Sequence, residues 1–152
     1  MANYDFRKDL VEGEEGEMVV LKDLESMGGK FISDNKNNKY DLLISKGDET
    51  ITYEIKTDVY CKPERDTGNM FIEFECRNKP SGIMVSEAKW FVTYYKHFNE
   101  LWYIKTSDLL KLTQTEALRL TSNSGDSGSN TRGYLLPRHK YKSHFKVRTI
   151  NG

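Results

Sequence analysis

Apolar and polar residues alternate in two short runs on either side of Gly47-Asp48, and this pattern predicts a β-hairpin. Glycine at the first central position suits a two-residue type II′ turn. If the hairpin is symmetric about that turn, residues i and 95 − i face each other. Asp41 then lies opposite Glu54, with their Cβ atoms about 5 Å apart. Lys56 follows Glu54 by two residues and shares its face, so the hairpin gathers two carboxylates and a lysine.

Residues from about 6 to 27 show the periodicity of an amphipathic helix, with Gly28-Gly29 as its expected end. The inward stripe includes two glutamates: Leu10, Glu14, Glu17, Leu21, Leu24 and Gly28. Carboxylates are rarely buried without a partner, so Glu14 and Glu17 are candidates for a functional site. An exposed acidic half of the helix explains them equally well. Glu17 is the better candidate because two leucines follow it on the stripe.

The remaining pattern predicts an α/β fold around a mixed sheet. The expected elements are a third strand at 70–76, a short helical turn capped by Ser86, strands at 90–95 and 101–105, a helix from Ser107 to about Leu120, and a last strand at 145–150. The Ser/Gly/Asn-rich stretch at about 121–133 predicts a flexible loop.

Composition indicates one domain over residues 1–152. Hydrophobic residues make up 37% and charged residues 30%, as in globular proteins, and no apolar run approaches the roughly 20 residues that span a bilayer. The N-terminus lacks the apolar core of a signal peptide. The two cysteines, Cys61 and Cys76, lack the spacing of a zinc site or a disulfide framework. A cytoplasmic location without membrane contact is therefore expected.

Net charge is zero overall, but the charges are unevenly distributed. Residues 127–152 hold six basic and no acidic residues, which leaves 17 basic and 23 acidic groups elsewhere, a net charge of −6. We expect the basic segment at 134–152, together with Arg132, to contact phosphates. The six cations are Arg132, Arg138, Lys140, Lys142, Lys146 and Arg148. A solvated basic tail is the alternative explanation.

The cluster on the hairpin has a defined chemistry. Carboxylate oxygens at close range suit Mg²⁺ or Mn²⁺, which keep several waters and take one or two protein carboxylates. A metal held by Asp41 and Glu54 can polarise a phosphoryl oxygen and lower the pKa of a bound water. Lys56 can orient or deprotonate that water or offset charge on the phosphate, and the sequence leaves these roles open. Glu17 is within reach as a further ligand. Cross-strand ion pairing of exposed residues is the alternative.

Tyr40-Asp41, then Glu54-Ile55-Lys56, preceded by a glutamate-bearing helix, resembles the PD-(D/E)xK nucleases, with Tyr in place of the motif's Pro. The stretches 67–73 and 81–90 resemble phage members, and the whole is closest in appearance to phage and archaeal-type Holliday-junction resolvases. The resemblance spans roughly residues 10 to 105. It implies a restriction-endonuclease-like core of order α-β-β-β-α-β. It also implies that Asp41, Glu54 and Glu17 are catalytic carboxylates that bind metal and that Lys56 is the catalytic lysine.

The resulting expectation is a Mg²⁺-dependent endonuclease, with Mn²⁺ as a substitute, that cuts branched DNA as a homodimer, because symmetric cuts require two sites. Thr67, Asn69 and Ser81 are further candidates for contacts with DNA phosphates, although each lies in a sequence that favours a turn. Two alternatives remain: a sequence-specific restriction-type or nicking endonuclease, and a non-catalytic DNA-binding phage accessory protein.

Overall fold

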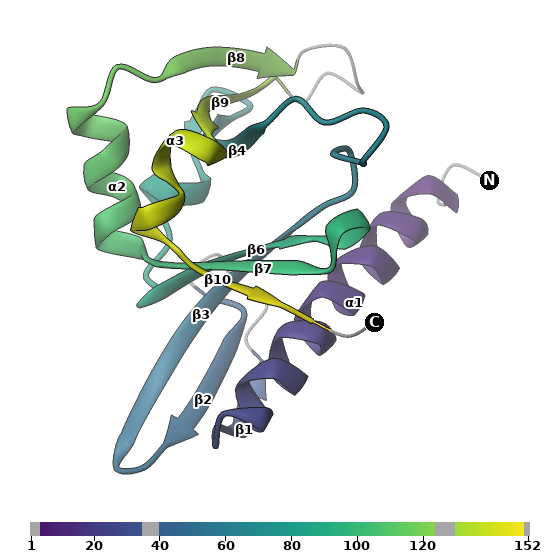
Figure 1. Ribbon diagram of the computed structural model, residues 1–152, viewed down its shortest axis with the longest axis vertical. Helices are drawn as coiled ribbons and strands as arrows, with labels where there is room; N and C mark the ends of the chain where they lie inside the picture. Colours follow the sequence, from purple (N-terminus) through teal and green to yellow (C-terminus); the bar gives the residue numbers. More distant parts are fainter. Residues whose placement is uncertain (1–3, 35–39, 124–129, 151–152) are drawn as a thin grey trace.

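The computed structural model describes residues 4–34, 40–123 and 130–150; for residues 4–14 and 123 it describes the backbone alone. The protein has a mixed α/β fold around a mixed six-stranded sheet, with a second sheet stacked on one side (Figure 1). In this part of the chain, no helix combines the length and apolar content needed to cross a membrane.

The main sheet has the strand order β1-β2-β3-β6-β7-β10. Its strands are β1 (Lys30–Asp34), β2 (Leu42–Lys46), β3 (Glu49–Asp58), β6 (Trp90–Tyr95), β7 (Glu100–Lys105) and β10 (Lys146–Thr149). All neighbours are antiparallel except β3 and β6, which run parallel. A parallel pair requires a crossover connection, and this crossover carries the chain through the second sheet.

The two faces of the main sheet carry separate apolar clusters. Helix α1 (Tyr4–Ser26) covers one face, where Val20 and Leu24 pack against Tyr53, Ile55 and the neighbouring strands. The other face packs against α2 (Thr106–Thr115) and the second sheet. Because side chains alternate along β3, Glu54 and Lys56 lie on this second face.

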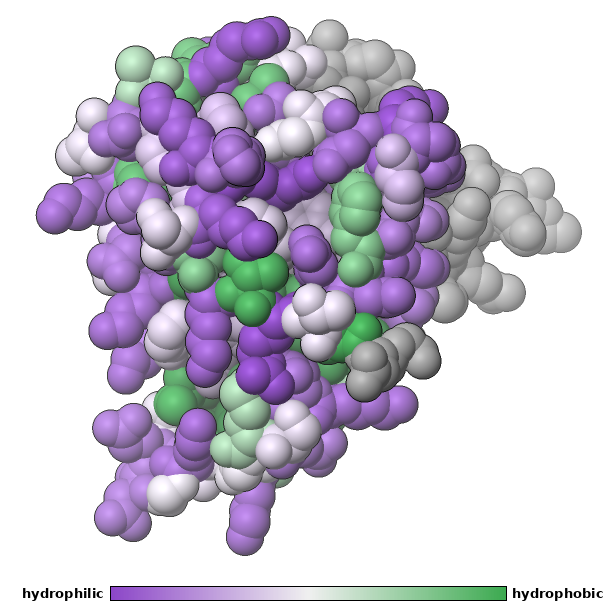
Figure 2. All heavy atoms as spheres, in the orientation of Figure 1, coloured by the Kyte–Doolittle hydropathy of each residue, from purple (hydrophilic) through white to green (hydrophobic). Residues whose placement is uncertain are grey.

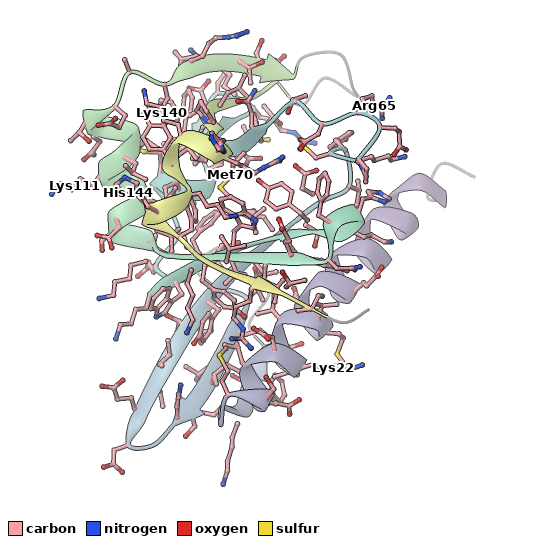
Figure 3. The ribbon with its side chains drawn as sticks, in the orientation of Figure 1. Lys22, Arg65, Met70, Lys111, Lys140 and His144 are labelled. Atoms are coloured by element: carbon pink, nitrogen blue, oxygen red, sulfur yellow. The ribbon has the colours of Figure 1, made fainter. Side chains whose placement is uncertain are left out.

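The second sheet has the order β5-β4-β9-β8. It consists of β4 (Asn69–Cys76), β5 (Lys79–Pro80), β8 (Arg119–Asn123) and β9 (Thr131–Pro137). Met70 of β4 reaches down into the core between the sheets (Figure 3). The chain then passes through α3 (Arg138–Tyr141) and the 3₁₀ turn η3 (Lys142–His144) before β10 returns to the main sheet.

The predicted hairpin is confirmed. Leu42 pairs with Tyr53 and Lys46 with Glu49, as the relation between i and 95 − i requires. Gly47 has a φ of 63°, whereas Asp48 is not among the residues of positive φ, which agrees with a type II′ turn. The predicted helix end is also confirmed, since the Gly28 and Gly29 amides donate to the Glu25 and Leu24 carbonyls in a Schellman motif.

Helix α1 buries a face one residue away from the predicted stripe. Gly16, Val20, Asp23 and Leu24 are buried, whereas Glu17 and Leu21 are half-buried at its margin. A Cβ on Gly16 would overlap the Thr57 hydroxyl, so this glycine allows α1 to approach β3. The side chains of Leu10 and Glu14, which begin the predicted stripe, lie outside the described part of the chain.

The predicted strand at 70–76 is confirmed as β4, but two expectations about this part of the chain were wrong. The 70–76 strand belongs to the second sheet, and β1, an exposed edge strand without apolar alternation, takes the expected place in the main sheet. No helix begins at Ser86, whose hydroxyl accepts a hydrogen bond from the Ala88 amide instead. A 3₁₀ turn, η1 (Gly82–Met84), precedes it, so strands and not an α-helix form the crossover.

The end of α2 and the predicted loop were also misplaced. Helix α2 ends at Thr115 and the chain continues into β8, so Leu118 and Leu120 lie beyond the helix. Within the predicted loop at 121–133, both ends are β-strand in β8 and β9, because the two strands pair across it. Residues 124–129 lie outside the described residues.

Candidate functional site

Asp41 and Glu54 meet where β2 begins and β3 continues past it. The Asp41 amide donates to the Tyr53 carbonyl at 2.8 Å, which extends the hairpin pairing by one residue. Its carboxylate oxygen Oδ2 accepts the Ile55 amide proton at 2.8 Å. The strand backbone therefore holds the Asp41 side chain at a fixed position beside Glu54.

Glu54 is the most perturbed carboxyl group of this cluster. Its pKa is raised from 4.5 to about 7, first because burial removes water from the carboxylate. Lys56 opposes this rise, whereas Asp41 adds to it through its negative charge and through a hydrogen bond between the two carboxyl groups. Near neutral pH Glu54 is therefore protonated for part of the time.

Lys56 lies on the open side of this pair. Its Nζ is 3.6 Å from Oε2 of Glu54, and its side chain is 45% exposed against 13% for Glu54. The lysine also lines a cleft of about 710 Å³ between the main and second sheets. A half-buried carboxyl pair thus adjoins an accessible cation at the edge of a cleft.

The donor set fits a divalent cation. Two carboxylates close enough to share a proton repel each other when both are ionised, and a cation between them would remove that repulsion. Two protein carboxylates with water in the remaining positions is the usual environment of Mg²⁺. In the described residues, however, no group of three or more His, Cys, Asp or Glu side chains is arranged to hold a metal. Asp41 and Glu54 are thus not joined by Glu17 in such a group.

Of the predicted phosphate-binding residues in turns, Thr67 lines the same cleft as Lys56. The backbone carbonyl of Asn69 accepts a hydrogen bond from the Arg138 guanidinium, a contact within the protein. The Ser81 hydroxyl is buried and has no hydrogen-bond partner among the described residues.

The three predicted DNA-binding arginines each contact an acidic side chain of the protein. Arg132 pairs with Glu75, Arg138 with Asp66, and Arg148 with Asp23. Arg138 also packs over the Tyr95 and Phe98 rings. All three guanidinium groups are thus paired within the protein, and only Asp23 among their partners is buried.

The three predicted lysines are exposed but do not share one surface. Lys140 and Lys142 lie on α3 and η3, which connect the second sheet to β10, and Figure 3 labels Lys140 there. Lys146 pairs in register with Tyr103 and so belongs to the α1 face of the main sheet, as does Arg148. The structure therefore divides the basic segment between both faces of the main sheet, and only part of it lies on the side of Lys56.

Asp23 is a buried charged residue that sequence reasoning missed. It is 8% exposed, accepts the Arg148 Nε proton at 2.8 and 3.0 Å, and accepts the Tyr103 hydroxyl proton at 2.7 Å. Its partners are far away in the sequence, so periodicity alone carried no signal for its burial. Asp58, by contrast, has a turn role, with Oδ1 accepting the Tyr60 and Cys61 amide protons.

Comparisons with protein-family models, with curated proteins and with solved structures each found no match.

Proposed function

We propose that this protein is a metal-dependent DNA endonuclease that hydrolyses phosphodiester bonds. The observation that carries the proposal is the contact between Asp41, Glu54 and Lys56, which puts a metal-seeking carboxyl pair beside a lysine at the edge of a cleft. A binding module has no need for such a pair, because burying Glu54 beside Asp41 is unfavourable without a cation.

The fold supports this proposal through its strand order. A helix on one face and neighbours β1-β2-β3-β6-β7, with β6 parallel to β3, are compatible with a restriction-endonuclease-like core. The crossover through β4, β5 and η1 departs from the α-β-β-β-α-β order. We include this core in the proposal because Glu54 and Lys56 lie on β3, the strand that begins the parallel pair.

Asp41 and Glu54 would hold Mg²⁺ or Mn²⁺, which supplies charge stabilisation at the phosphate and a water of lowered pKa. The chain supplies the rest. The Ile55 amide orients the Asp41 carboxylate, and burial of Glu54 strengthens electrostatic interactions there. Lys56 would place its ammonium group beside the phosphate and the attacking water.

Branched DNA, above all a four-way junction, is the proposed substrate, and a homodimer is the proposed active form. The basic side chains on the cleft side, Lys140 and Lys142, would contact phosphates beyond the site. The Ser/Gly-rich segment between β8 and β9 follows Thr121, which also lines the cleft.

The test is cleavage of end-labelled four-way junctions and of linear duplexes of the same sequence, in Mg²⁺, Mn²⁺ or EDTA. We expect cleavage in either metal and none in EDTA. Lys56→Ala, Asp41→Asn and Glu54→Gln should each lower the cleavage rate by about 100-fold or more. Lys46→Ala is the matched control, because Lys46 is an exposed lysine on the same hairpin.

Full activity of Lys56→Ala, or cutting in EDTA, would overturn the mechanism. Equal cutting of junction and duplex would favour a restriction-type or nicking enzyme. Tight DNA binding without cleavage in any metal would favour an accessory protein.

A further inference from the structure

The cleft beside Lys56 has features that the cleavage chemistry does not use. It is bounded by β3 and β6 of the main sheet and by β4, β8 and β9 of the second sheet. Its volume of about 710 Å³ is within the range of sites that enclose small organic molecules. Lys56, Tyr60, Thr67, Phe71, Glu73 and Thr93 are among its lining residues.

Two aromatic side chains are exposed in this cleft although most aromatics of the chain are packed. Tyr60 is 70% exposed and Phe71 40% exposed. On the face that Figure 2 shows, hydrophilic side chains separate small apolar patches. Packing in the hydrophobic core therefore does not account for two exposed rings in one concave site.

A hydrogen bond fixes the backbone at Tyr60, and a close contact positions the Phe71 ring. The Tyr60 amide donates to Oδ1 of Asp58 at 2.9 Å, which fixes the turn that presents the tyrosine. Phe71 lies against β9 at Gly133, where a Cβ would overlap its ring atoms. The absence of a side chain at Gly133 thus makes room for Phe71, so its ring is positioned before any ligand arrives.

The charges in the cleft favour a base over a phosphate. Asp58 and Glu73 line it together with Lys56, and two carboxylates would repel a phosphate held deep inside. The Thr67 hydroxyl and the Glu73 carboxylate, which both line the cleft, match the amino and carbonyl groups on base edges.

Cations lie at the margins of this cleft, where the backbone of a strand would pass. A smaller hollow of about 480 Å³ adjoins it, since both are lined by Tyr60, Thr67 and Phe71, and Arg65 borders this second hollow. Arg65 lies on the loop between β3 and β4 (Figure 3). Lys56 in the cleft and Arg65 beside the adjoining hollow would contact phosphates of that strand.

We propose that the cleft binds one unstacked base of the substrate strand, beside the phosphate that Lys56 contacts. Tyr60 and Phe71 stack on the base, and Glu73 with the Thr67 hydroxyl contacts its edge. This inference rests on the proposed nuclease function and deepens it, because it makes an unpaired nucleotide part of the substrate. Junctions and bulges supply such a base at low cost, whereas a continuous duplex must first unstack one.

The test uses a duplex with one unpaired 2-aminopurine and the same duplex with that base paired, in Ca²⁺ to limit cleavage. The wild-type protein should bind the bulged duplex more tightly and quench its fluorescence by stacking. Tyr60→Ala and Phe71→Ala should each weaken binding of the bulged duplex by about 10-fold and remove the quenching. Tyr60→Phe should retain both, because the ring is kept.

Phe31→Ala is the matched control, since Phe31 is a 47% exposed phenylalanine on edge strand β1, away from the cleft. Tyr60 is in an exposed turn, so its variant remains informative if Phe71→Ala unfolds. Unchanged affinity and quenching in Tyr60→Ala would overturn the base-binding inference even if the protein cuts DNA. Loss of quenching in Tyr60→Ala, in a protein that never cuts DNA, would leave the base site standing and refute the nuclease proposal. No binding to either duplex would refute both.

Discussion

At the scale of single residues, the shifted pKa of Glu54 links stability to pH. Burial and Asp41 raise the pKa of Glu54 to about 7 in the folded protein, above its ordinary value of 4.5. The folded state therefore holds the proton over a pH range in which the unfolded chain has released it. Stability is lost as pH rises through that range, and the loss is complete above about pH 7 to 8.

In EDTA, the free energy of unfolding of the wild-type protein should fall between pH 5 and pH 8 by up to about 3 kcal/mol more than that of Glu54→Gln. Denaturant unfolding at several pH values measures this difference. Glu49→Gln is the control, because Glu49 is an exposed carboxylate at the start of the same strand. Mg²⁺ at pH 8 should restore stability to the wild type and not to Glu54→Gln. Parallel pH profiles of wild type and Glu54→Gln would contradict the prediction.

Strand β10 carries two cations in different environments. Arg148 binds the buried Asp23, whereas Lys146 is exposed. Arg148→Ala should lower the free energy of unfolding by about 1–3 kcal/mol, because it leaves the buried Asp23 with fewer hydrogen bonds. Lys146→Ala should cost about 0.5 kcal/mol or less, since Lys146 is exposed. Urea unfolding compares them. If Arg148→Ala instead kept its stability and lost DNA affinity, Arg148 would be a phosphate contact as the sequence suggested.

At the scale of elements, the crossover depends on a close approach between η1 and β4. Gly82 has a φ of 54°, and a Cβ there would overlap the carbonyl of Glu73. Both facts require glycine, because L side chains are unfavourable at that φ and the backbone carbonyl cannot move aside. The turn thus holds Glu73 at its place on the cleft.

Gly82→Ala should therefore destabilise the protein by clearly more than Gly47→Ala, which should cost about 1 kcal/mol. Gly47 has a similar φ of 63°, but nothing lies within 4 Å of a Cβ there. The control thus measures the backbone penalty alone. Thermal unfolding of both variants gives the comparison, and equal melting temperatures would show that β4 yields to the added methyl group.

At the scale of the whole molecule, paired cuts across a junction require two copies of the site. We expect light scattering to give twice the chain mass. A mixture refolded from wild type and Lys56→Ala should contain dimers with one active site, which nick one strand without resolving the junction. Full resolution by a monomer would contradict this prediction.

Much of the local structure follows from the sequence because its causes are local. Gly47 and the alternation around it determine the hairpin register, which brings Asp41 to Glu54. Gly28 and Gly29 likewise end α1 through hydrogen bonds to carbonyls three and five positions back. The strand β1 escaped prediction because an exposed edge strand has no buried face to produce alternation.

The sequence by itself thus determined the acidic pair and its lysine, since a tight turn and period-two alternation suffice to put them on one face. Only the tertiary structure decided what that face meets. Packing of the second sheet made the cleft around Tyr60 and Phe71, and it took β4 out of the main sheet. Asp23 and Arg148 pair although 125 residues separate them, a contact that no local pattern encodes. Such contacts form only when the core assembles. Residues adjacent in the sequence determine which face of its helix or strand a side chain occupies, but not what that face packs against.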